Sequence, residues 1–78
     1  MGLEAFIKQA RPHTMRTFIL QEGLRLEFDY VMGGRKCFRA FTIKPETFID
    51  VLSLAHATQT GSRIGAYGYE RTYSLGKV

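Results

Sequence analysis

The sequence predicts a single small α+β domain over residues 1–78, in which an antiparallel β-meander of three to four strands is covered by one main helix. Three observations predict this fold class. Residues 24–32 alternate apolar and polar side chains with a period of two, which is typical of a strand with one buried face. Gly33 and Gly34 follow directly and favour a hairpin turn. Residues 45–58 then carry a broad apolar face at helical spacing.

The segment before these strands is predicted to be a short helix over residues 2–10. Its apolar residues have the spacing of one helix face: Leu3, Phe6, Ile7 and Ala10. Pro12 ends the helix, because a proline disfavours helical geometry at the residue before it. Residues 14–21 are then predicted to form the first strand, and Glu22-Gly23 supplies the turn into the second.

Residues 35–43 are predicted to return from the hairpin turn as the third strand. This strand has aromatic residues on both faces, with Phe41 on one and Phe38 on the other. It is therefore either central in a sheet covered on both sides, or it presents one aromatic ring outward.

The main helix is predicted over residues 45–58, because Pro45 suits a first helical position. Residues 60–62, Thr-Gly-Ser, are interpreted as a break. Residues 61–73 follow as a fourth strand or an arm, so the predicted order is α-β-β-β-α-β.

The composition indicates a binding protein with an anionic partner. Lys and Arg total 11 against 7 Asp and Glu, the net charge is +4, and the pI is about 9.6. Such a balance points to nucleic acid, an anionic membrane surface or an acidic protein. Most of the cations are arginines, which suit planar contacts and stacking.

The small size of the domain predicts a homodimer. A chain of this length buries only ~60–65% of its unfolded surface and is marginally stable alone. Cys37 is the only cysteine, so an internal disulfide is excluded. We expect no membrane partner, because no apolar run approaches the ~18–20 residues of a membrane span. The first residues lack a secretory pattern, so a cytoplasmic location is expected.

The sequence contains no catalytic signature, and we expect a protein without enzymatic activity, cofactor or metal. Cys37 lies in mid-strand, where a lone cysteine usually acts as a small buried hydrophobe. Arg35 and Arg39 beside it are the one feature that favours a reactive thiol. His56 is interpreted as a cation at a helix C-terminus, and His13 as a solvated residue in a linker.

The strongest functional pattern is the mixing of cations with aromatic rings. Single-strand binding proteins use this combination, because cations follow the backbone and rings stack on bases. The predicted binding residues are Arg35, Lys36, Arg39, Arg63, Tyr67, Tyr69, Arg71 and Tyr73. A period of two over residues 61–73 places the last five on one face, which we expect to be exposed. The alternative is that these tyrosines pack in the core or against a second copy of the chain.

One stretch resembles a known family. Gly34-Arg35-Lys36, the short strand Phe41-Thr42-Ile43 and the helix start Pro45-Glu46 resemble the strand-to-helix passage of the transcriptional coactivator family called positive cofactor four. The resemblance covers residues 14–58, and the N-terminal helix and the tyrosine-rich end depart from it. It implies a dimer with a curved antiparallel sheet that binds single-stranded DNA.

Two other classes of function stay open. A small phage- or plasmid-type inhibitor, similar to anti-CRISPR proteins, would use the Tyr/Arg strip to bind a host protein or nucleoprotein complex, since both residue types are enriched at interface hot spots. A toxin-like ribonuclease ranks last, because His13, Arg11 and Arg16 lack an evident second acid or base.

Overall fold

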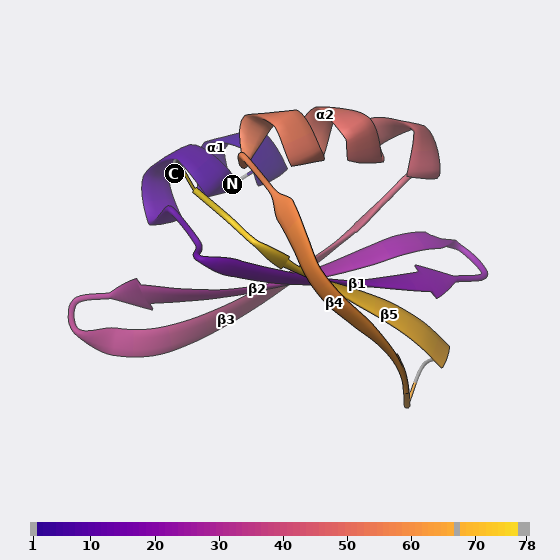
Figure 1. The fold of residues 1–78 in the computed structure, drawn as a ribbon. Coiled ribbons are helices and arrows are strands. Elements are labelled where there is room, and N and C mark those ends of the chain that lie inside the picture. The colour runs from indigo at the N-terminus through magenta and orange to yellow at the C-terminus, as the bar shows by residue number, and fades with distance from the viewer. Residues whose placement is uncertain (1, 67, 77–78) are drawn as a thin grey trace.

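Five antiparallel strands form one sheet, and two helices lie on the same face of it (Figure 1). The computed structural model describes residues 2–66 and 68–76. The strand order is β3-β2-β1-β5-β4. The elements are α1 (Leu3–Ala10), β1 (Thr14–Leu20), β2 (Gly23–Met32), β3 (Arg35–Ile43), a 3₁₀ turn (Pro45–Thr47), α2 (Phe48–Leu54), β4 (Thr58–Gly65) and β5 (Gly68–Ser74).

The core lies between the sheet and the two helices. The sheet contributes the fully buried side chains Met15, Leu26 and Phe28, and α2 contributes Val51. The period of two in β2 is therefore confirmed, because its apolar residues face the helices and its charged residues face away.

α1 is a larger part of the core than the sequence predicts. Phe6 is 2% exposed, and its ring centroid lies 5.4 Å from that of Phe28, 5.1 Å from Tyr30 and 5.3 Å from Phe41. Tilted and edge-on ring pairs at such distances are favourable. Two helices, rather than one main helix, therefore cover the sheet.

The predicted helix over residues 45–58 is too long. Regular α-helix ends at Leu54, and His56 has φ 51°, which is left-handed. The Ala57 N–H donates to the Leu52 carbonyl, and β4 begins one residue later at Thr58. No helix among the described residues is long and apolar enough to span a membrane.

The tyrosine-rich end forms a hairpin of two strands rather than one strand. Residues 60–62, predicted as a break, lie inside β4, where the register shifts between Gln59 and Gly61. Gly65 pairs with Gly68, so the chain reverses between them. β5 then inserts between β1 and β4, which makes five strands where three to four were predicted.

Candidate nucleic-acid interface

The tip of the β2–β3 hairpin points toward the same side of the molecule as the C-termini of both helices (Figure 1). Thr14, the first residue of β1, lies opposite Asp29 of β2 and Ser74 of β5. The Leu75 N–H donates to the His13 carbonyl, and the Gly76 N–H to the Ala55 carbonyl. We call this region the hairpin end; it comprises residues 8–13, 29–39, 54–57 and 74–76.

The β2–β3 hairpin extends past β1. Asp29 is the last residue of β2 that pairs with β1. The next three residues of β2, Tyr30 to Met32, pair with β3 alone. Gly33 and Gly34 have φ of 60° and 76°, the geometry of a tight turn that glycine adopts without strain. Val31 and Met32 are 53% and 55% exposed.

Phe38 is the aromatic ring that this hairpin presents to solvent. It is 53% exposed and lies on the sheet face that the helices leave open, as does Lys36. Arg35 is on the opposite face, opposite Met32 in the register. The sequence-based alternative in which β3 turns one aromatic outward is therefore confirmed.

Within the described part of the chain, three cations of the hairpin end, Arg11, Arg35 and Lys36, lack a carboxylate at ion-pair distance, whereas Lys8 lies 3.5 Å from Glu4. The acidic side chain at this end, Asp29, accepts a hydrogen bond of 3.1 Å from Thr14 and lies 3.9 Å from Arg16. The hairpin end therefore carries uncompensated positive charge.

Cations elsewhere on the open face of the sheet are compensated. Arg16 lies 3.3 Å from Glu27, and Arg25 donates to Glu27 at 2.9 Å. Arg63 donates to Glu70 at 3.0 Å, and this carboxylate is 3% exposed. Arg16 thus pairs across strands with both Glu27 and Asp29 of β2.

Arg39, the third predicted cation of β3, is half-buried and lies at the edge of the core. Its guanidinium lies 5.5 Å from the centroid of Phe6 and 4.9 Å from that of Phe41. Such cation–π contacts hold the side chain against the rings. The structure thus brings Arg35 and Lys36 together at the tip and places Arg39 lower on the strand.

The prediction that Arg63, Tyr67, Tyr69, Arg71 and Tyr73 form one exposed face is wrong for Tyr73. This residue is 5% exposed, lies opposite Met15 and packs edge-on against Phe48 with 5.9 Å between ring centroids. It belongs to the core because β5 is an inner strand of the sheet. Tyr67 lies outside the described residues.

The prediction of a shared face is also wrong for Arg63, which lies on the opposite sheet face from Tyr69 and Arg71. Gly65 pairs with Gly68, so from Gly61 to Gly65, after the register shift, the odd-numbered residues of β4 share a face with even-numbered residues of β5. A period of two counted straight through the turn therefore assigns Arg63 to the wrong face. Its partner in the register is Glu70.

Tyr69 and Arg71 are exposed at the other end of the sheet. The guanidinium of Arg71 lies 5.5 Å from the Tyr69 ring centroid. Hydrogen bonds from Ser62 and then from Arg71 hold the pKa of Tyr69 below its ordinary value of 10.0. Hydrogen bonds to Tyr73 and then to Tyr69 raise the pKa of Arg71.

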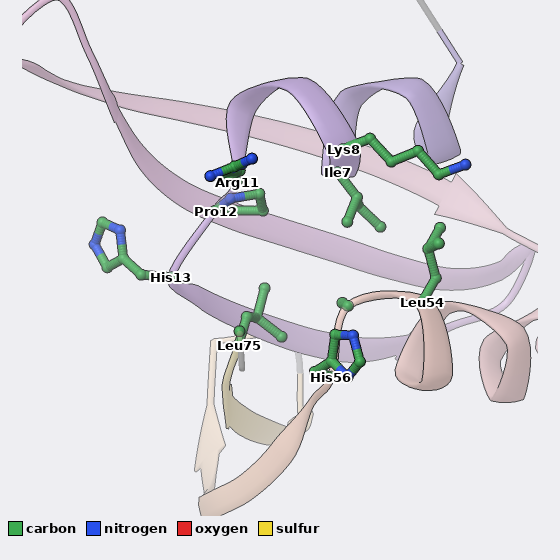
Figure 2. Close-up of a pocket in the computed structure, with 10 residues that line it drawn as sticks. Ile7, Lys8, Arg11, Pro12, His13, Leu54, His56 and Leu75 are labelled. Atoms are coloured by element: carbon green, nitrogen blue, oxygen red, sulfur yellow. The ribbon is translucent and has the colours of Figure 1, made fainter. Parts of the chain in front are cut away.

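A second feature of the hairpin end is a cleft of about 470 Å³ between the C-termini of α1 and α2 (Figure 2). Its cationic and titratable lining residues are Lys8, Arg11, His13 and His56, and its apolar ones include Ile7, Leu54 and Leu75. The sequence analysis did not assign this site. The available signal was that a basic residue follows each helix within two positions.

The backbone is strained at two places in this cleft. Among the described residues, Arg11 and His56 are the non-glycine residues with positive φ, at 49° and 51°. Left-handed geometry costs a residue with a Cβ roughly 1–2 kcal/mol. Positions just after a helix that need this geometry are usually filled by glycine or asparagine.

Cys37 is partly exposed on β3, and its thiol lies 3.6 Å from the Arg35 carbonyl. The described residues contain no group of three His, Cys, Asp or Glu side chains that could hold a metal ion.

Comparisons of the chain with protein-family models, with curated proteins and with solved structures found no match. The function is therefore inferred from the geometry and charge of the described residues.

Proposed function

We propose that this protein is a non-enzymatic binder of single-stranded nucleic acid, DNA or RNA, and that the β2–β3 hairpin is its main contact surface. The observation that carries the proposal is the exposed Phe38 ring on the same sheet face as Lys36, with Arg35 next to Lys36 on the other face; neither cation has a carboxylate within ion-pair distance among the described residues. Arg35 and Lys36 would neutralise phosphates, and Phe38 would stack on a base.

The proposal favours single strands because a ring that stacks on a base needs that base unpaired. Phe38 stands on a strand face rather than in a deep pocket, so it can accept any base. We therefore expect affinity with little dependence on sequence and a strong dependence on salt.

We also propose that a second copy of the chain docks at the other end of the sheet. An apolar patch lies there, which we call the far-end patch: Ile19, Leu24, Phe48, Ile64 and Tyr69. Ile19 is 67% exposed, and Ile64, which pairs with Tyr69, is 85% exposed. A dimer made there would leave both hairpin ends accessible.

The test is a titration of labelled single-stranded and double-stranded oligonucleotides of the same sequence. We expect tighter binding of the single strand and a marked loss of affinity between about 50 and 200 mM salt. If the protein binds neither form at low salt, the proposal is wrong, and the far-end patch instead favours an inhibitor that binds another protein.

A further inference from the structure

The cleft between the helix C-termini has the charge and shape of a site for an anionic ligand with a flat apolar part. None of the ten described residues that line it is acidic. In Figure 2, Arg11 and His56 lie on opposite sides of the cleft, and apolar side chains, among them Leu75, lie between them. Lys8 is partly compensated, because its amine lies 3.5 Å from Glu4.

The strained backbone supplies a second, independent observation. Arg11 and His56 have positive φ on two separate segments, and both line this one cleft. Glycine at either position would remove the strain, but it would also remove the side chain that lines the cleft. Residues held in unfavourable backbone geometry cluster at ligand sites, where the side chain is needed.

The size and the lining indicate which anion fits. A volume of about 470 Å³ falls in the range of small-molecule sites, ~300–1,000 Å³. Inorganic phosphate alone would leave the partly exposed side chains of Leu54 and Leu75 facing water. A nucleotide would cover these apolar side chains with its base and place its phosphate at the cations, and a histidine ring can stack on a base.

His13 lies between the cleft and the hairpin. It lines both this cleft and a second one of about 330 Å³ beside the hairpin, whose lining includes Tyr30, Lys36 and the acidic residue Asp29. A strand bound at Lys36 and Phe38 can therefore reach the cleft with one end.

We propose that the cleft binds the terminal nucleotide of a nucleic-acid strand, with the terminal phosphate at Arg11 and the base on the apolar floor against the His56 ring. The role of a strand end rests on the proposed function. A free nucleoside monophosphate has the same chemistry and is the other source of the ligand.

The sequence provides a direct reporter, because its two histidines, His13 and His56, both line the cleft. Their imidazole NMR signals would be followed at fixed pH during titration with adenosine monophosphate, and separately with inorganic phosphate. We expect a saturable shift of the His56 signal with the nucleotide and a weaker response to phosphate. Equal responses would overturn the role of the apolar floor, and no response to either would overturn the site.

The strand-end role is tested with oligonucleotides that carry a 5′-phosphate, a 3′-phosphate or neither. We expect one phosphorylated form to bind at least roughly tenfold tighter than the unphosphorylated strand, as a charge-assisted contact allows. Equal binding of all three would overturn the strand-end role and leave single-strand binding intact. If no strand binds but adenosine monophosphate still shifts His56, single-strand binding fails and the ligand is a free nucleotide.

The variant Arg11→Gly separates binding from folding. Because glycine accepts positive φ, we expect its melting temperature to equal or exceed that of the parent, while the preference for the phosphorylated strand is lost. His56→Gly should also stay folded and should bind adenosine monophosphate more weakly, which the His13 signal follows. Lys44→Ala, which removes an exposed cation outside the cleft, should keep the preference. An Arg11→Gly protein that folds and retains the full preference would contradict the assignment.

Discussion

Phe38 and Phe41 lie on the same strand and have opposite roles. Phe41 faces the helices and contacts the ring of Phe6, whereas Phe38 is 53% exposed on the open face. An exposed ring contributes little to the core, so Phe38 can be removed without unfolding the protein. The same ring is the part of the hairpin that can stack on a base.

We therefore predict that Phe38→Ala weakens single-strand binding by about 1–3 kcal/mol, as loss of one stacked base does, and leaves the melting temperature nearly unchanged. The measurement is a titration of a labelled single strand together with a thermal melt. Ile49→Ala is the control, because it removes an exposed apolar side chain of α2 that belongs neither to the hairpin end nor to the far-end patch, and it should bind like the parent. Equal affinity for the parent and Phe38→Ala would remove Phe38 from the interface.

Tyr69 offers a separate test of the local geometry. Hydrogen bonds from Ser62 and Arg71 stabilise its phenolate and lower its pKa. The folded state thus binds this proton less tightly than the unfolded chain. The contribution to stability is fully present above the unfolded pKa, near 10.0, and is lost as the pH falls through the lower folded pKa.

We predict that ultraviolet absorbance during an alkaline titration shows a tyrosine that ionises below its ordinary pKa, and that Tyr69→Phe removes this component. Ser62→Ala should move the component back toward the ordinary value, because Ser62 gives the largest lowering effect. A Tyr69→Phe protein with an unchanged titration curve would contradict the hydrogen bonds described here.

The β4–β5 hairpin depends on a close approach between Gly65 and Glu70. A Cβ added to Gly65 would collide with the Glu70 carboxylate, which is buried and bonded to Arg63. Gly61, on the same strand, has open space around its Cα. The two glycines therefore form a matched pair for substitution.

We predict that Gly65→Ala destabilises the protein by about 1–3 kcal/mol, as overpacking does, and that Gly61→Ala has a much smaller effect. Chemical denaturation measures both changes. In a Glu70→Ala background, Gly65→Ala should cost less, because the carboxylate that it would displace is gone. Equal costs of Gly65→Ala in the two backgrounds would rule out this contact as the cause.

The first three strands could be predicted from the sequence, whereas the last two could not be separated. β2 has a clear alternation, and Gly33-Gly34 marks its turn, so local pattern determines the structure there. β4 is polar and contains glycine at Gly61 and Gly65, which are uncommon in strands. The position of β4 in the sheet depends on its pairing with β5. The periodicity of a sequence does not show which strand is the partner.

The candidate site could be predicted only in part for the same reason. Arg35 and Lys36 are found at an exposed tip because the hairpin itself was predictable. Tyr73 is a core residue because β5 pairs with β1. Arg63 lies on the opposite face from Tyr69 and Arg71, because the turn after Gly65 breaks the alternation that the sequence suggests. The cleft needed the two helix ends to be placed side by side, which depends on packing rather than on local sequence.

The molecule as a whole has two different ends. The hairpin end carries Arg11, Arg35 and Lys36, which have no carboxylate within ion-pair distance among the described residues, and the other end carries the far-end patch, where Ile64 is 85% exposed. This separation allows a second copy to dock at one end while nucleic acid binds at the other.

We predict a homodimer that Ile64→Asp converts to a monomer, because a carboxylate placed in an apolar interface would lose its hydration. Sedimentation over a range of protein concentrations measures this change. Val31→Asp is the control, since Val31 is an exposed apolar residue at the hairpin end and should leave the dimer intact. A parent protein that sediments as a monomer at tens of micromolar (roughly the range of weak dimers) would exclude the docking role of the patch.

The most direct test of the account is the salt dependence of single-strand binding in the double variant Arg35→Ala/Lys36→Ala. For single strands, each phosphate contact contributes about 0.7 to the slope of log affinity against log salt concentration. We predict weaker binding and a slope smaller by about 1.4, the sum of two such contacts, while Lys44→Ala keeps nearly the parental slope. An unchanged slope in a double variant that remains folded would contradict the assignment of the β2–β3 hairpin as the nucleic-acid interface.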